Sequence, residues 1–227
     1  MVRELFNSIA ERYDLVNRLT TLGLDKRWRR KACETALTYL DVKKPRILDV
    51  ACGTGDMIRC MMKRLEKRGV PARFYGLDCS ERMLEIARKK VPFAELRVGN
   101  AEDIPFPDGS FDLVSVAFGL RNFSEREKAI SEIHRVLKQG GILLLLEFSR
   151  NESPLGKLAW FYTRSVVPII GGILTGNREA YDHLWRSIEA FPSPEELSRE
   201  FEKRGFEVLT IRWFFPRIAF VMILRKV

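Results

Sequence analysis

Short apolar segments alternate with helical segments along the middle of the chain, and this alternation limits the possible folds more than any other feature. The strand-like segments are residues 46–51, 72–78, 95–99, 111–118 and 142–148. The helical patterns among them are residues 57–68, 81–90 and 125–137. Strands separated by helices are joined by crossover connections, which favour parallel pairing under helices on both faces. The chain is therefore predicted to be an α/β protein with a mostly parallel sheet.

The segments around this core complete one predicted domain of 227 residues. Residues 1–44 carry apolar side chains three and four residues apart, which predicts a helical region that ends before Pro45. The core occupies 45–149. Residues 150–190 break the alternation and are expected to be an insertion that covers the site, because long insertions in compact domains are usually functional. Residues 191–227 then supply a helix and two closing strands.

The loop at 52–56 contains two glycines and directly follows the first strand. Gly53 and Gly55 permit a tight turn and let a ligand approach the backbone. In open α/β sheets, ligands bind beyond the carboxyl ends of the strands, where this loop is expected. Asp78 ends the second strand, where a carboxylate can accept hydrogen bonds from ribose hydroxyls. These residues predict a nucleoside-containing cofactor, either NAD or S-adenosylmethionine.

Two features favour S-adenosylmethionine over NAD. The dinucleotide fingerprint has a third glycine where this chain has Ile58. Asp49, just before the loop, would repel a pyrophosphate but can help to hold the ammonium group of a methionine. After the third strand, Asn100, Ala101 and Glu102 offer polar groups to an adenine. An NAD-dependent oxidoreductase stays open as an alternative.

The chain is basic, with a net charge of +9. This charge suits nucleic acid, an anionic membrane surface or simply a solvated exterior. The densest basic cluster, residues 26–31, holds one aromatic residue, Trp28, whereas single-stranded nucleic acid is usually bound with interleaved aromatic side chains. A basic nucleic-acid-binding protein with a vestigial cofactor site is thus a remote alternative, and no nucleic acid partner is expected.

Other features of the sequence bear on its location and on metals. No charge-free apolar run reaches the roughly 20 residues of a membrane span, and the N-terminus lacks the apolar stretch of a signal peptide. We therefore expect a cytoplasmic protein. The four cysteines form no C-x-x-C pair and have no histidine at zinc spacing, so no metal site is expected.

Several motifs are spread from about Leu5 to Gly205. They are residues 6–10 with Tyr13, Asp14 and Asn17; 48–56; 99–102 with 105–106; 118–122; 146–149; Pro168 with Gly171; Tyr181 with Leu184; and 187–188 with 191–192. Together they resemble the ubiquinone/menaquinone biosynthesis C-methyltransferase family, and 118–122 and 147–149 are the most specific. The chain departs from the family pattern at Cys52, where glycine is usual, and in the tail at 214–220.

The resemblance implies a Rossmann-like class I methyltransferase fold, in which a seven-stranded sheet ends in an antiparallel hairpin. It implies S-adenosylmethionine as cofactor, with S-adenosylhomocysteine as product, and C-methylation of a prenylated quinol such as demethylmenaquinol. Arg121 and Asn122 are then expected to face the acceptor, where Arg121 stabilises phenolate charge and Asn122 orients a hydroxyl or a water. A methyltransferase for another lipophilic or small acceptor is the main alternative.

The base of such a reaction is not evident from the sequence. A quinol carbon becomes nucleophilic when the neighbouring hydroxyl loses its proton, so a base is needed. Arginine is a poor base, with a pKa above 12. Neither His134 nor His183 is an obvious base, and His134 is expected to be structural.

Access to a prenylated acceptor suggests a membrane contact. The insertion carries aromatic and aliphatic residues between about Leu155 and Gly172, interrupted by Arg164 and Pro168, and is expected to be too short to cross a bilayer. With the basic N-terminal helices it is expected to form a face that touches an anionic membrane peripherally.

Overall fold

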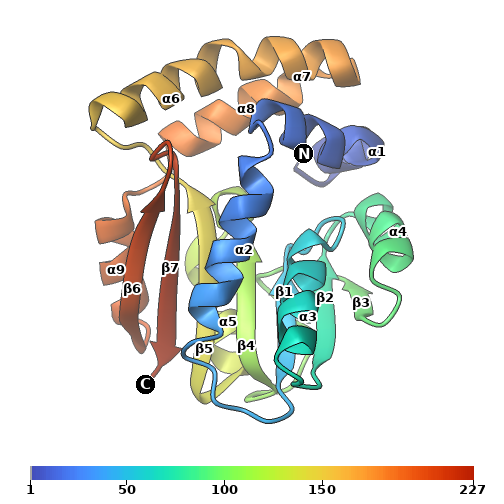
Figure 1. Ribbon diagram of the computed structural model, residues 1–227, viewed down its shortest axis with the longest axis vertical. Coiled ribbons are helices and arrows are strands. Elements are labelled where there is room, and N and C mark those ends of the chain that lie inside the picture. Colours follow the sequence, from blue (N-terminus) through green and yellow to red (C-terminus); the bar gives the residue numbers. More distant parts are fainter. Residues whose placement is uncertain (1) are drawn as a thin grey trace.

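The computed structural model describes residues 2–227 and confirms the α/β class (Figure 1). Within these residues the strands form one seven-stranded sheet in the order β3-β2-β1-β4-β5-β7-β6. The strands are β1 Arg46–Val50, β2 Arg73–Asp78, β3 Glu95–Val98, β4 Phe111–Ala117, β5 Leu137–Phe148, β6 Phe206–Phe214 and β7 Ala219–Lys226. The β5–β7 and β6–β7 pairs are antiparallel and the other pairs are parallel. The expected terminal hairpin is confirmed.

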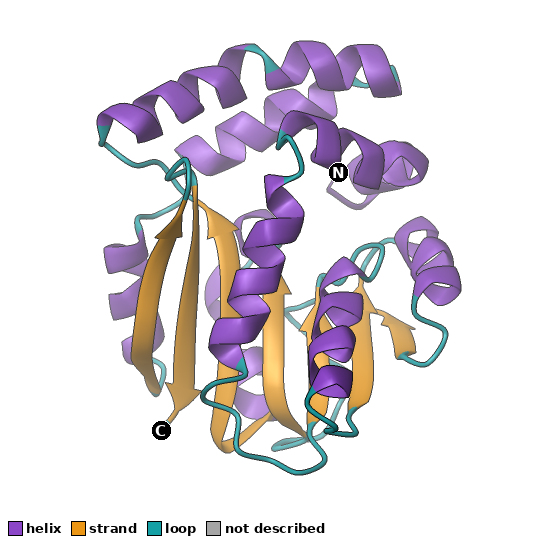
Figure 2. Ribbon diagram, in the orientation of Figure 1, coloured by secondary structure: helices purple, strands orange, loops and turns teal. Residues whose placement is uncertain are grey.

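Helices cover both faces and one end of the sheet (Figure 2). One face carries α2 Leu24–Ala36, α3 Asp56–Lys67 and α4 Glu81–Lys90; the other carries α5 Arg126–Val136 and α9 Pro194–Glu202. Beyond the carboxyl ends of the parallel strands lie α1 Val2–Thr20, α6 Pro154–Ser165, α7 Val167–Thr175 and α8 Arg178–Glu189. The short helix η1 Leu120–Asn122 follows β4. The N-terminal region and the insertion thus meet above the same edge of the sheet.

The central strands are buried on both faces, which explains their continuous apolar sequences. Successive side chains of a strand point to opposite faces, so Ile47 packs toward α2 and α3 whereas Leu48 and Val50 pack toward α5 and α9. A third apolar cluster is separate from the sheet and joins α1, α7 and α8. These three helices therefore form a cap with a core of its own.

Most predicted elements agree with the structure to within one or two residues, as for α4, where Ser80 accepts a hydrogen bond from the backbone N–H of Met83. Residues 139–141, which precede the predicted strand at 142–148, contain two glycines that favour a turn, but they lie inside β5. Between the pairs Phe111–Leu137 and Leu113–Ile142, residues 138–141 of β5 oppose Asp112 alone. The glycines accommodate a bulge in a continuing strand rather than a turn that begins it.

The insertion is helical throughout most of its length. The segment Pro154–Thr175, which spans α6 and α7, is long and apolar enough to cross a membrane by length and composition alone. The expectation that the segment is too short to cross a bilayer, which treated Arg164 and Pro168 as interruptions, is therefore wrong. Pro168 lies in the first turn of α7, where its missing N–H has no intrahelical partner to lose.

Candidate active site

The strand order reverses between β1 and β4, and the site lies where these two strands end. Ala51 follows β1 with φ +55°, and Phe118 follows β4 with φ +60°. A positive φ is strained for residues other than glycine, and such strain concentrates at functional sites. Two adjacent cavities open beside these residues.

The first cavity, here called the polar cleft, has a volume of about 550 Å³. Its walls come from the loops after β1, β2, β3 and β4 and from α1. They include Arg3, Phe6, Tyr13, Ala51, Gly53, Asp78, Cys79, Asn100, Ala101, Glu102, Phe118, Gly119 and Asn122. Five of the residues that the sequence assigned to the cofactor thus meet here: Gly53, Asp78, Asn100, Ala101 and Glu102.

The two glycines of the loop have different positions. Gly53 lines the cleft with φ +53°, and a Cβ there would enter open space. Gly55, with φ +83°, faces α4, where a Cβ would lie 2.9 Å from Cγ2 of Val91. Gly53 therefore leaves room for a ligand, whereas Gly55 lets the loop pack against a helix.

Asp78 and Asp49 differ in their access to the polar cleft. Asp78 lies on the cleft wall and accepts hydrogen bonds from the backbone N–H groups of Gly53 and Ser80, both at 2.8 Å. Burial raises the pKa of Asp78, and these bonds oppose the rise. Asp49 lies behind the wall, 2% exposed, and accepts a 2.5 Å hydrogen bond from Ser115 Oγ. Burial raises the pKa of Asp49 to about 7.

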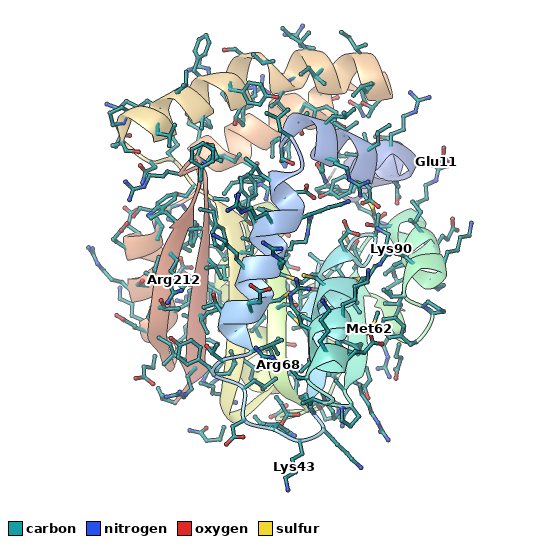
Figure 3. All side chains as sticks on the ribbon, in the orientation of Figure 1. Glu11, Lys43, Met62, Arg68, Lys90 and Arg212 are labelled. Atoms are coloured by element: carbon teal, nitrogen blue, oxygen red, sulfur yellow. The ribbon has the colours of Figure 1, made fainter. Side chains whose placement is uncertain are left out.

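Helix α1 closes the cleft from above and is tied to its loops. Nζ of Lys90 lies 2.5 Å from Asp14 Oδ2, 2.8 Å from Thr54 Oγ1 and 2.7 Å from Asp56 Oδ1. Figure 3 labels Lys90 in the space between α1, α3 and α4. The Asp14 motif thus connects α1 to the glycine loop through a cation from α4.

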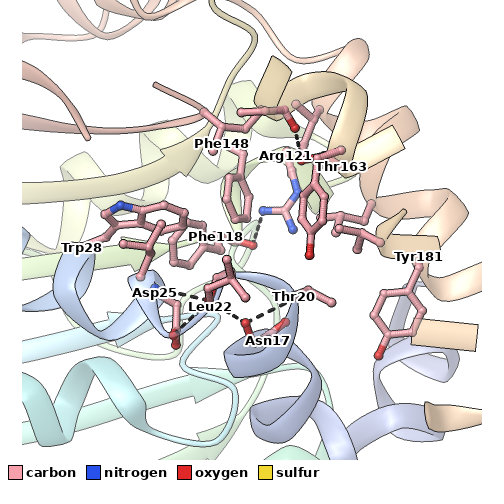
Figure 4. Close-up of a pocket in the computed structure, with 18 of the residues that line it drawn as sticks. Asn17, Thr20, Leu22, Asp25, Trp28, Phe118, Arg121, Phe148, Thr163 and Tyr181 are labelled. Atoms are coloured by element: carbon pink, nitrogen blue, oxygen red, sulfur yellow. Dashed lines mark hydrogen bonds between the residues drawn. The ribbon is translucent and has the colours of Figure 1, made fainter. Parts of the chain in front are cut away.

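The second cavity, here called the apolar cavity, has a volume of about 460 Å³ and lies under the cap (Figure 4). Aromatic and aliphatic side chains from α1, α2, α6, α8 and the β6–β7 turn make most of its wall. They include Phe6, Ile9, Tyr13, Trp28, Phe118, Phe148, Leu158, Tyr162, Leu184 and Phe215. Phe6, Tyr13, Phe118 and Asn122 line both cavities, so the cavities adjoin at these residues.

Arg121 is a charged residue on the wall of the apolar cavity, as are Asp25 and Arg29. One of its terminal nitrogens donates to Glu147 Oε1 and to the carbonyl of Phe118, both at 2.6 Å. Burial raises the pKa of Glu147, and Arg121 acts in the opposite direction. The Nε of Arg121 is buried and has no hydrogen-bond partner among residues 2–227. A buried donor without a partner is unfavourable, which fits a ligand group at this position.

His183 of α8 also lines the apolar cavity, and its Nε2 lies 3.0 Å from Asn122 Oδ1. Burial lowers the pKa of His183, and the charges of Arg121 and Arg186 lower it further. The imidazole is therefore neutral near pH 7. A cation, an amide and a neutral imidazole thus meet next to the junction of the two cavities.

Comparison with a protein-family model decides the family. Residues 1–219 match the model of the ubiE/COQ5 methyltransferase family. The chain belongs to this family. It is an S-adenosylmethionine-dependent methyltransferase, and the resemblance seen in its motifs is confirmed.

Individual relatives extend over nearly the whole chain. The ubiquinone/menaquinone biosynthesis C-methyltransferase UbiE of Campylobacter jejuni is 39% identical and covers 98% of this chain and 96% of its own. The demethylmenaquinone methyltransferase of Thermus thermophilus is 45% identical over 90% of this chain and 92% of its own. A solved methyltransferase structure from Thermotoga maritima has a TM-score of 0.66 at 24% identity, covering 99% of both chains, and shows the shared fold.

The two cavities bring together most of the site residues that the sequence predicted. The polar cleft gathers most of the residues assigned to S-adenosylmethionine, and Arg121 and Asn122 lie in the adjoining cavity. Glu147 was noticed only as part of a family motif, and His183 was set aside. No sequence spacing reveals these two, because they lie 26 and 61 residues from the partners they contact.

Proposed function

We propose that this methyltransferase transfers a methyl group to a ring carbon of a prenylated quinol, with demethylmenaquinol as its acceptor. Two relatives support this proposal through their names, which specify ubiquinone/menaquinone biosynthesis and demethylmenaquinone. The observation in this chain that carries it is the apolar cavity, whose wall is mostly aromatic and aliphatic and includes the polar group Arg121, Asn122 and His183. This arrangement fits a molecule with a hydroxylated ring at one end and a long apolar tail.

The polar cleft suits the cofactor, which supplies a methyl group on a sulfonium. We assign Asp78 to the ribose, because each of its oxygens has lone pairs beyond the backbone bonds it accepts. Asn100 and Ala101 border the expected adenine position. Glu102 has an additional role, since its Oε1 accepts hydrogen bonds from Ser124 at the start of α5. Asp49 contributes negative charge from behind the wall.

We assign the acceptor to the apolar cavity, next to Arg121 and Asn122 of η1. Arg121 stabilises the negative charge that develops on the quinol oxygen, a role that a preorganised buried cation performs without reorganisation. The segments 1–44 and 150–190 then cover the acceptor, while 45–149 binds the cofactor and 191–227 completes the sheet. Exclusion of water by this cover strengthens the electrostatic interaction between Arg121 and the acceptor.

The direct test is methyl transfer from labelled S-adenosylmethionine. We expect incorporation of label into reduced demethylmenaquinone, on a ring carbon, as identified by mass spectrometry of the product. The same quinone without reduction is the control and should take no label, because it has no hydroxyl to ionise. Label in a small hydrophilic acceptor but not in the quinol would contradict the proposal and favour the alternative acceptor class.

We further propose that the mouth of the apolar cavity rests on an anionic bilayer. Leu22, Leu158 and Phe215 line the cavity and are also exposed, by 84%, 65% and 67%. Exposed large apolar residues that rim a cavity are typical of an interaction surface. Exposed Lys26 and Arg217 lie close to them in the chain and supply positive charge. A prenyl tail can pass from lipid into the cavity through this rim.

The rim can be tested with vesicle co-sedimentation. The Leu22→Asn, Phe215→Ser variant is expected to lose at least about tenfold in affinity for anionic vesicles at low salt, because each large apolar side chain contributes about 1.5–3 kcal/mol on burial. Leu22 has φ +52°, which asparagine tolerates well, so folding should be kept. Val98→Ser is the matched control, 45% exposed on β3. Equal binding by the rim variant and the control would rule the surface out.

A further inference from the structure

His183 holds a position that the sequence does not explain. It lines the apolar cavity, and its imidazole Nε2 is 3.0 Å from Oδ1 of Asn122, which lines both cavities. An amide oxygen only accepts, so the Nε2 of the neutral ring carries the hydrogen and Nδ1 keeps its lone pair. The amide thus fixes the tautomer, and the free lone pair belongs to the other nitrogen.

We propose, resting on the proposed function, that His183 is the base of the reaction and that Asn122 orients it. The acceptor is a quinol with one ring hydroxyl beside the carbon to be methylated. Nδ1 of His183 takes the proton of that hydroxyl, while Arg121 stabilises the phenolate that forms. His183 is therefore the catalytic residue that receives the proton, and Asn122 is a positioning residue.

The step balances in atoms and charge. The hydroxyl proton first moves to His183 and leaves a phenolate. An electron pair delocalised from this phenolate onto the ring carbon then forms the new carbon–carbon bond, and the sulfur–methyl bond breaks with its pair left on sulfur. The methylated carbon then loses its own hydrogen to water as a proton, which restores the aromatic ring as a phenolate. That phenolate takes back the proton from His183, so one proton is released for each methyl group transferred.

The surroundings of His183 favour a neutral ring that can accept a proton. The titratable or charged residues that line the cavity with it are Tyr13, Asp25, Arg29, Arg121, Tyr162 and Tyr181. Arg121 and Arg186 are the charges that lower its pKa. Helix α7 contributes no charged or titratable residue. Because the proton comes from the acceptor, the imidazolium forms beside a new phenolate. The charges of the two offset each other inside the cavity, where a lone imidazolium near Arg121 would be unfavourable.

The chain offers a matched control, since it has two histidines. His134 lies against Phe206, with ring centroids 5.2 Å apart, and lines neither cavity. Glutamine at 183 can still donate to Asn122 but does not titrate. The comparison is therefore between the wild-type enzyme, His183→Gln and His134→Gln, assayed as pH profiles of kcat with S-adenosylmethionine and reduced demethylmenaquinone.

We expect the wild-type kcat to fall on the acid side with an apparent pKa below 6.5, the ordinary value of histidine. In His183→Gln the acid limb should be absent and kcat lower by about 10²-fold, the typical contribution of a general base. The KM for the quinol should change by less than about threefold, because glutamine keeps the contact with Asn122. His134→Gln should retain the wild-type profile.

Different outcomes contradict the proposed function and this inference. A wild-type enzyme that does not methylate the quinol contradicts the proposed function, whereas an active enzyme whose acid limb survives in His183→Gln overturns the base. A second measurement does not require turnover. In His134→Gln bound to S-adenosylhomocysteine, the single imidazole NMR signal belongs to His183, and we expect it to titrate below pH 6.5. A ring that stays protonated above pH 7 overturns the proposal.

Discussion

Replacement of Arg121 with methionine is expected to lower kcat by about 10³-fold, the upper range for loss of one donor to a developing oxyanion. The dissociation constant of the cofactor should change by less than about threefold, because Arg121 lies in the apolar cavity and not on the wall of the polar cleft. An interaction made chiefly in the transition state acts on turnover in this way. Single-turnover methyl transfer and titration calorimetry with S-adenosylhomocysteine measure the two quantities.

The same substitution affects folding, and a double variant separates the two effects. Without Arg121, the fully buried carboxylate of Glu147 loses its partner, so the free energy of unfolding is expected to fall by about 3–5 kcal/mol. Arg121→Met with Glu147→Gln buries no charge, and most of that stability should return. Activity should stay low in the double variant. Recovery of kcat to within about threefold of the wild type would show that Arg121 acts only on folding.

The core of the fold was predictable because its signal is local. Each central strand is a short apolar run, and cap-favouring residues such as Ser80 before α4 and Gly69 after α3 mark helix ends. The insertion was harder to predict. Its helices α6 and α7 carry apolar residues on exposed as well as buried sides, so no single helical stripe distinguishes them. Only contacts with α1 and α8 show which side faces the cavity.

The position of a site residue was predictable only where its place at the end of a strand determines that position. Gly53 follows β1 and Asp78 ends the neighbouring strand β2, so the topology alone brings them together. Gly55 and Asp49 belong to the same motif, but the backbone turns Gly55 toward α4 and buries Asp49 behind the wall. His183 reaches the site only because the insertion folds back over η1, and that contact has no local sequence pattern.

Burial of the ionised Asp49 carboxylate is expected to lower the free energy of unfolding, and a variant should reveal this effect. Asparagine at 49 is expected to stabilise the cofactor-free protein above pH 7 and to weaken cofactor binding. In the folded protein the pKa of Asp49 is about 7, against an ordinary value of 3.8, so the folded state binds more protons than the unfolded state between these values. Stability therefore falls as pH rises through this window, by about 4 kcal/mol at 1.36 kcal/mol per pKa unit.

Asp49→Asn has no such dependence, so the variant and the wild type should differ little near pH 3 and most above pH 7. Asparagine can still accept the bond from Ser115. Asp112→Asn is the control, because Asp112 pairs with Lys138 at 2.7 Å and its loss should destabilise the protein. Denaturant unfolding at pH 4 and pH 8 measures the difference, and an Asp49→Asn protein less stable than wild type at pH 8 contradicts it. With cofactor present the order should reverse, since the ammonium and sulfonium charges favour ionised Asp49 and stabilise only the wild type through it. Burial of the Asp49 carboxylate thus destabilises the protein without cofactor, whereas attraction between this carboxylate and the positive charges of the cofactor stabilises the complex.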